Sequence, residues 1–268
     1  MAALDPFTPN DELPTDGVPI RPAATVVLLA DRPHLEVLTL RRSDQLVFAP
    51  DHTVFPGGVV DQSDHDPRWL DLATCPNPQE TPGLAHRVAA VRETIEEVGV
   101  LVGTTESSLL THRHQLEQGQ VIFADLIEKT GGLNLSQVHA ISRWVTPMPG
   151  PRRYDAYFFV APAPANAAPA ADGGEAVEVA WLRPAQALQQ WATGELTMIS
   201  PTRSILQRLA GYQTTAQVLA AAALGGPPEL VRIGDEHSEK VYFPADPGYH
   251  QSHLKEGMGW VWLPAAPA

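Results

Sequence analysis

Three glutamates lie within five residues of one another in the stretch Arg92-Glu93-Thr94-Ile95-Glu96-Glu97. An α-helix turns about 100° per residue, so glutamates at i, i+3 and i+4 share one face. Carboxylates this close repel one another, and Arg92 is the one cation directly beside them. Hard divalent cations prefer several oxygen ligands, so the spacing is typical of a site for Mg²⁺ or Mn²⁺ and phosphate. A solvated acidic helix face is the alternative.

The helix that carries these glutamates is predicted over residues 83–98, where the apolar residues have the clearest helical period in the chain. The apolar side chains fall on one side and the glutamates fall opposite, together with small residues and His86. Upstream, Phe55-Pro56-Gly57-Gly58 interrupts the extended segment 53–60 and requires a sharp turn or a close backbone approach. This turn is a second feature that favours a cation and phosphate site at the glutamates.

The remaining segments predict an α+β fold. Strands are expected at 24–30, 35–41, 138–146, 154–161 and 176–182, with the first two adjacent and antiparallel, and short strands in the tail 230–263. Helices are expected at 106–117, 119–129, 184–192, 201–210 and 214–223. The low-complexity stretch 162–174 predicts an exposed hairpin loop. Helices at both ends of such a sheet indicate α/β/α layering.

Composition limits the partners of the 268-residue chain. Its 31 acidic and 18 basic residues give a net charge of −13, which argues against nucleic acid or an anionic membrane as a partner. A single cysteine forms no internal disulfide. Residues 1–20 are acidic and proline-rich, so we expect a disordered or extended arm, no signal peptide and a cytoplasmic location. Residues 21–268 are expected to form a single domain, with an insertion at 61–82 and a helical C-terminal extension at 184–268.

Residues 92–100 resemble the second half of the motif that marks the Nudix family. They match R-E-U-x-E-E-x-G-U, where U is apolar, at every fixed position, and depart at Thr94. Gly58 matches the glycine that opens the motif, but Arg92 follows it by 34 residues, which is 20 more than the family pattern. The family motif also has a glutamate between that glycine and the arginine. Asp64 and Glu80 are both candidates for this glutamate, and neither is assigned. The long insertion is similar to the Nudix subgroup that includes the peroxisomal coenzyme A diphosphatase of animals.

The resemblance implies a Nudix-like α/β/α sandwich around a mixed sheet, with hydrolysis of a nucleoside diphosphate linked to another group, such as coenzyme A or acyl-coenzyme A. It implies that Glu93, Glu96, Glu97 and the carbonyl of Gly58 bind Mg²⁺ or Mn²⁺, and that Glu93 can also act as base. Arg92 is expected to orient the glutamates by a bidentate salt bridge. The same chemistry on NADH, ADP-ribose or nucleoside triphosphates is an alternative, as is a non-catalytic nucleotide-binding module.

Five further residues are candidates for binding the substrate. Arg41 and Arg42 resemble the arginine of the signature found upstream in coenzyme A-cleaving members, whose other fixed residues are missing here; a solvated strand end is the alternative. Glu175 and Glu178 are candidates for the acid that Nudix enzymes often take from another loop, or are ordinary polar positions of an edge strand. Arg152 is a candidate phosphate ligand, or part of a surface turn.

Three histidines are interpreted as structural or surface residues. His52, His65 and His86 lack zinc-site spacing, although His86 shares the face of the glutamates. The sequence leaves the role of the insertion 61–82 open; one role is a lid that selects the non-nucleotide arm of a small diphosphate substrate. Trp260 and Trp262 are predicted to pack either on the domain or in a homodimer.

Overall fold

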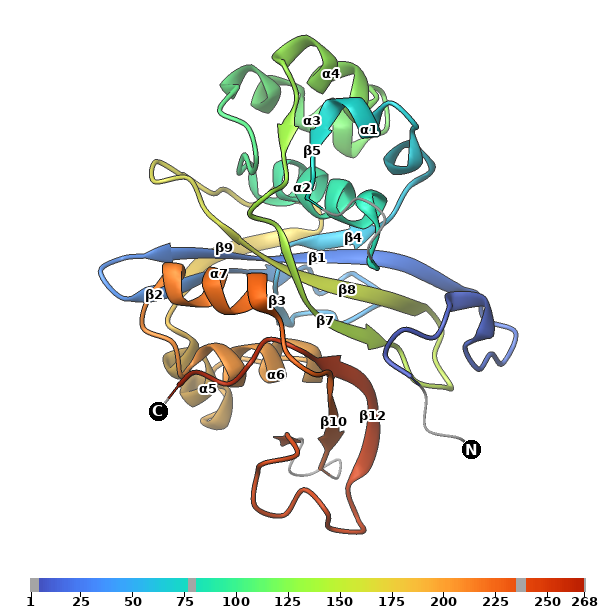
Figure 1. Cartoon of the computed structure of the whole chain (residues 1–268), viewed down its shortest axis with the longest axis vertical. Coiled ribbons are helices and arrows are strands. Elements are labelled where there is room, and N and C mark those ends of the chain that lie inside the picture. Colours follow the sequence, from blue (N-terminus) through green and yellow to red (C-terminus); the bar gives the residue numbers. More distant parts are fainter. Residues whose placement is uncertain (1–4, 77–80, 235–239, 268) are drawn as a thin grey trace.

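A mixed β-sheet crosses the middle of the computed structural model, which describes residues 5–76, 81–234 and 240–267 (Figure 1). The strand order is β11 (Val241–Tyr242), β10 (Glu229–Ile233), β12 (Lys255–Val261), β7 (His139–Val145), β8 (Arg153–Pro162), β1 (Ile20–Asp31), β2 (Leu35–Arg42) and β3 (Thr53–Val54). Two strands lie off this path: β4 (Gly57–Val59) pairs with β1, and β9 (Ala176–Leu182) pairs with β2. The β1–β8 pair is parallel and the other pairs of this sheet are antiparallel.

Helices cover both faces of the sheet (Figure 1). One face carries α1 (Trp69–Leu72), α2 (Leu84–Val98), α3 (Arg113–Glu117) and α4 (Phe123–Thr130); the other carries α5 (Pro184–Ala192), α6 (Ser200–Leu209) and α7 (Thr215–Leu224). Side chains of a strand point alternately to the two faces, so in β1 Val26 belongs to the first core and Val27 to the second. The expected α+β fold with α/β/α layering is confirmed.

Short elements complete the chain. Three 3₁₀ turns are η1 (Asn10–Glu12), η2 (Gln62–His65) and η3 (Ser107–His112), and β5 (Ala73–Thr74) pairs in parallel with β6 (Leu133–Asn134). The helix expected at 106–117 is therefore divided into η3 and α3, and the next helix begins at Phe123. Within the described residues, no helix is long and apolar enough to cross a membrane.

The hairpin predicted around residues 162–174 is wrong. Strand β8 already has β1 on one edge and β7 on the other, so the following strand β9 has no free edge of β8 to pair with. It crosses to β2 instead, where Leu182 lies opposite Val37 and Glu178 opposite Arg41.

The N-terminal arm lies against the sheet over its described part. Two buried arginines hold it through main-chain carbonyls: Arg143 Nη1 donates to Pro6 O at 2.9 Å, and Arg153 Nη1 donates to Pro14 O at 2.8 Å. Leu13 is buried in a small core with Trp260. Trp260 therefore packs on the domain itself.

The described part of the insertion is a packed element beside α4. Trp69 is buried against Phe123, with ring centroids 5.4 Å apart. Arg68 forms an ion pair with Asp125 of α4 at 2.8 Å. The insertion is thus held onto the helical layer above α2.

Candidate active site

Helix α2 is buried from Arg87 to its last residue, which excludes the solvated acidic face. Glu93, Glu96 and Glu97 are between 5% and 9% exposed. The helix ends at Gly99, whose φ of 64° is the left-handed conformation that glycine adopts without strain. Thr94 is tolerated in place of an apolar residue because its hydroxyl donates locally and lies 2.8 Å from two carbonyl oxygens, those of Val91 and Val100.

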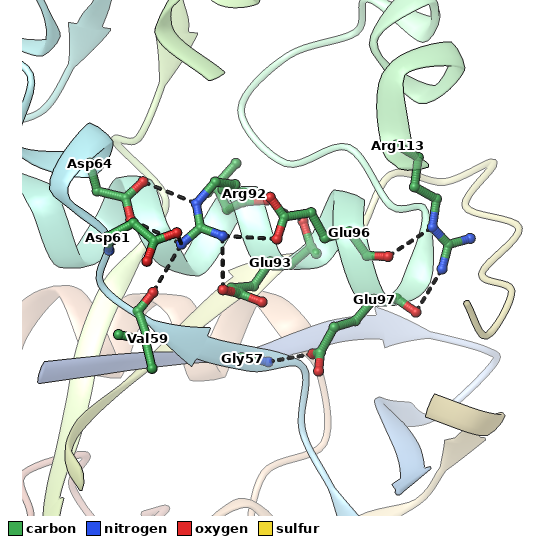
Figure 2. A network of polar contacts seen from close by, with 11 residues as sticks. Gly57, Val59, Asp61, Asp64, Arg92, Glu93, Glu96, Glu97 and Arg113 are labelled. Carbon is green, nitrogen blue, oxygen red and sulfur yellow. Dashed lines mark hydrogen bonds and ion pairs between the residues drawn. The ribbon is translucent and has the colours of Figure 1, made fainter. Parts of the chain in front are cut away.

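The glycine turn packs directly on the glutamates (Figure 2). Strand β4 pairs with β1, and the main-chain N–H of Gly57 donates to Glu97 Oε2 at 2.7 Å. A Cβ atom on Gly58 would lie 2.4–2.7 Å from the carboxylate of Glu93, and one on Gly57 would lie 2.5 Å from Ala24 O. A side chain at position 57 would therefore collide with the main chain of β1, and one at position 58 would displace the Glu93 carboxylate.

Arg92 is the centre of the polar network (Figure 2). Its Nη1 donates to Glu93 Oε1 at 2.9 Å and to Glu96 Oε2 at 2.8 Å. Its Nε and Nη2 donate to the two carboxylate oxygens of Asp64 at 3.1 Å and 2.9 Å, and Nη2 also donates to Val59 O. Arg92 thus gives one hydrogen bond to each of two glutamates, and its bidentate partner is Asp64.

Asp64 occupies the position of the glutamate that the family motif has between Gly58 and Arg92. It is 1% exposed, lies six residues after Gly58 in η2, and accepts the main-chain N–H of Asp61 at 2.8 Å. The 20 additional residues in the motif therefore follow Asp64. The spacing of Asp64 from Gly58 is the signal in the sequence that identifies this residue. The other candidate, Glu80, lies outside the described residues.

The site buries more acidic side chains than cations. Burial raises the pKa of Glu93 to about 8, although Arg92 offsets part of the rise. Burial also raises the pKa of Glu97 well above its usual value, and the neighbouring Glu93 adds to it. Burial likewise raises the pKa of Glu96. Arg113, the first residue of α3, donates to the main-chain carbonyls of Glu96 and Glu97 at the end of α2 and not to their carboxylates (Figure 2).

A cleft of about 850 Å³ opens in front of these groups. Arg42, Arg152 and Glu175 line it, while Arg41 and Glu178 do not. Successive side chains of a strand point to opposite faces, so Arg41 points away and pairs with Glu178 at 3.2 Å. Arg42 and Glu175 lie 3.8 Å apart.

Segments distant in sequence supply cleft residues that the pattern did not indicate. They come from β1, α3, the 163–175 loop, α6 and β12, and include Arg21, Glu117, Asp172, Arg203 and Lys255. No local signal in the sequence could have found them, since pairing between remote strands brings them together. His52 also lines the cleft, and the described residues of the insertion after Asp61 do not, so that part of the chain is not a lid over it.

His86 lies outside the cleft. Its ring packs edge to face on Tyr157, with centroids 5.1 Å apart. Burial lowers the pKa of His86 to about 4, so it is neutral at pH 7.

The glutamates do not form a complete set of metal ligands in this structure. Among the described residues, no group of three or more His, Cys, Asp or Glu side chains is placed to hold a metal ion. Glu93 and Glu96 each give one oxygen to Arg92, and Glu97 gives one to Gly57. The second oxygen of each glutamate makes no hydrogen bond within the described part of the chain.

The fold and the glutamate helix under a glycine turn define the class of Nudix hydrolases. The crystal structure of a Nudix hydrolase from Alicyclobacillus acidocaldarius superposes with a TM-score of 0.67 at 26% identity, covering 76% of this chain and 97% of that one. The NUDT19 Nudix domain family matches residues 76–209. The chain therefore belongs to the NUDT19 Nudix domain family of Nudix hydrolases, enzymes that act on diphosphate bonds.

Three relatives of the chain have names that place them among the Nudix hydrolases. Acyl-coenzyme A diphosphatase NUDT19 of Gallus gallus is 26% identical over 72% of this chain and 69% of its own length. The protein of the same name from Xenopus laevis is 25% identical over 66% of this chain and 60% of its own length. Putative nudix hydrolase 7 of Caenorhabditis elegans is 27% identical, over 70% of this chain and 60% of its own length. The resemblance to the coenzyme A diphosphatase subgroup is confirmed.

Proposed function

We propose that this chain is a divalent-cation-dependent pyrophosphohydrolase that cleaves the diphosphate linkage of coenzyme A or acyl-coenzyme A. One observation carries the proposal: the three buried glutamates of α2 meet the Gly57-Gly58 turn at a cleft that also contains arginines. The carboxylates suit a hard cation and the arginines suit phosphate. The names of the vertebrate relatives support the substrate.

The donor set fits Mg²⁺ or Mn²⁺. Glu93, Glu96 and Glu97, with the carbonyl of Gly58, would hold the cation through hard oxygen ligands. Each glutamate keeps one carboxylate oxygen available, and a divalent ion would stabilise the ionised form of these buried acids. A bound cation neutralises phosphate charge and lowers the pKa of water.

The protein's own residues position these ligands. Asp64 holds the guanidinium of Arg92, which in turn fixes Glu93 and Glu96, and the N–H of Gly57 fixes Glu97. A carboxylate held in this way can orient water and accept its proton, the role we assign to Glu93. Arg42 lines the cleft as a ligand of the diphosphate, Arg152 lines it as a ligand of a phosphate group further along, and Glu175 is the acid from outside the helix.

Two alternatives make different predictions. The same chemistry on NADH, ADP-ribose or nucleoside triphosphates would use the same glutamates with another substrate arm. A non-catalytic binding module would release no product, and membership of a hydrolase family disfavours it.

A substrate panel tests the proposal. Purified protein with Mg²⁺ or Mn²⁺ is incubated with coenzyme A, an acyl-coenzyme A, NADH, ADP-ribose and dNTPs, and products are resolved by chromatography. We expect phosphopantetheine, or its acyl form, and adenosine 3′,5′-bisphosphate. Glu97→Gln should abolish turnover, and it should weaken Mn²⁺ binding measured by calorimetry. Wild-type turnover of Glu97→Gln, or product from none of the substrates, would contradict the proposal.

A further inference from the structure

Two arginines face the cleft without a partner. Arg21 and Arg152 both line it and are exposed, and within the described residues neither forms an ion pair or a side-chain hydrogen bond. The chain has 31 acidic residues against 18 basic ones, so acidic partners are plentiful. Arg41, Arg42, Arg68, Arg92 and Arg143 all have such partners. Unpaired guanidinium groups in an acidic protein are therefore placed to meet an anion that comes from outside.

Strand register brings the two arginines to one end of the cleft. Arg21 lies opposite Tyr154 in the parallel β1–β8 pair, and Arg152 precedes Tyr154 by two residues. On the other side of β8, the N–H of Thr146 donates to Tyr154 O at 2.9 Å. Arg21, Tyr154 and Thr146 all line the cleft and form one row across β1, β8 and the residue that follows β7.

A third cation extends the row from the C-terminal strand. In the antiparallel β12–β7 pair Gly259 lies opposite Trp144, which places Gly257 beside Thr146. Lys255 lies two residues before Gly257 in β12, and both line the cleft. We call Arg21, Arg152 and Lys255 the cationic end. Residues 229–261 lie beyond the 76–209 match to the family, so β12 is a contribution of the C-terminal extension.

The cationic end is separate from the glutamates. Gly57 lies opposite Thr25 of β1, four residues along the strand from Arg21. At about 3.3 Å per residue this corresponds to about 13 Å. Between the two ends, the small side chains of Ala23 and Ala156 line the cleft and leave room for a ligand. The cleft therefore has room for a second anionic group of the same ligand beside the diphosphate.

We infer that the cationic end binds a second phosphate group, a monoester carried by the nucleoside part of the diphosphate substrate. The inference rests on the proposed function, because it assumes that the scissile diphosphate lies at the glutamates. Arginine presents several N–H groups in a fork that matches phosphate oxygens, and several cations suit a dianion. The structure thereby assigns Arg21 and Arg152 to the discrimination between substrates with and without this phosphate.

A matched substrate pair tests the inference. Coenzyme A and 3′-dephospho-coenzyme A share the diphosphate and differ in one phosphate monoester. For wild type we expect kcat/KM to be at least about tenfold higher with coenzyme A. The double variant Arg21→Gln/Arg152→Gln should reduce this ratio about tenfold, which corresponds to about 1.4 kcal/mol of discrimination.

The control is Arg183→Gln. Arg183 precedes α5, is exposed, makes no ion pair within the described residues and does not line the cleft. It should leave the ratio at the wild-type value, and Arg152→Lys should retain more discrimination than Arg152→Gln. A ratio that the double variant leaves unchanged, or a wild-type ratio near one, would overturn the inference.

Binding separates this inference from the proposed function. Calorimetry compares adenosine 3′,5′-bisphosphate with adenosine 5′-monophosphate on wild type and on the double variant. If neither coenzyme is hydrolysed but the bisphosphate binds about tenfold more tightly to wild type alone, the proposed function fails and the inference stands. If both coenzymes are hydrolysed equally well by wild type, the inference fails and the proposed function stands.

Discussion

Removing Asp64 should damage the active site without touching a glutamate. Its two carboxylate oxygens accept Arg92 Nε and Nη2 at 3.1 Å and 2.9 Å, and one also accepts the N–H of Asp61. Both members of the pair are buried, Asp64 at 1% and Arg92 at 6% exposure. Asp64→Ala therefore leaves a buried guanidinium without two of its five hydrogen bonds.

The magnitude follows from this geometry. Breaking one side of a buried ion pair costs about 3–5 kcal/mol. Asp64 also adds to the raised pKa of Glu93, so its removal relieves some repulsion, and we expect a loss near the lower limit, about 3 kcal/mol. Arg92 keeps its bonds to Glu93 and Glu96 but loses the anchor that orients them. Misplacing catalytic groups by about 1 Å costs roughly 10²-fold, so kcat should fall by about that factor.

Urea unfolding measures the stability, and turnover of the substrate identified by the panel measures kcat and KM. The control is Asp71→Asn, an exposed acid of the same insertion without an ion pair among the described residues, which should change neither quantity. A double-mutant cycle with Arg92→Ala should show coupling, because the two residues act on the glutamates together. Wild-type kcat in Asp64→Ala, or strict additivity in the cycle, would refute the reasoning.

Three further perturbations test other parts of the structure. Gly58→Ala places a Cβ atom 2.4–2.7 Å from the Glu93 carboxylate, so we expect about 1–3 kcal/mol of destabilisation in urea unfolding and a loss of turnover; an unperturbed variant would contradict the close approach. Burial lowers the pKa of His86 to about 4, below its value of about 6.5 in the unfolded chain, so stability should fall as pH drops from 6.5 toward 4. His86→Phe should lose this dependence on pH. The difference in the free energy of unfolding between wild type and variant should change by up to about 2.5 kcal/mol between pH 7 and pH 4.5, whereas parallel pH profiles would be inconsistent with a buried neutral imidazole. Mg²⁺ or Mn²⁺ at about 100 times its Kd should stabilise the protein by about 2.7 kcal/mol in the same unfolding assay, and Glu96→Gln should lose most of that gain; a shift of equal size in the variant would argue against the ligand set.

Local pattern predicted the elements near the site well. The helix expected at 83–98 is α2 at Leu84–Val98, and the helix expected at 184–192 is α5 at Pro184–Ala192. Both have strong helical periods or clear start signals, which depend on neighbouring residues alone. The hairpin at 162–174 failed because the partner of β9 is a strand more than 130 residues earlier in the chain, and no local signal encodes that pairing.

The sequence by itself determined the helix that carries the three glutamates and the family to which the chain belongs. Glu93, Glu96 and Glu97 share a helix face through the fixed rotation of the α-helix, and their spacing from Arg92 and Gly58 identified the family. Tertiary structure alone decided that this face is buried, that Asp64 is the partner of Arg92, and that Arg42 enters the cleft while Arg41 leaves it. The reason is physical: helix rotation is a property of adjacent residues, whereas burial and strand register depend on contacts between segments distant in sequence. The cationic end is the clearest case, since β1, the turn before β8 and β12 meet there.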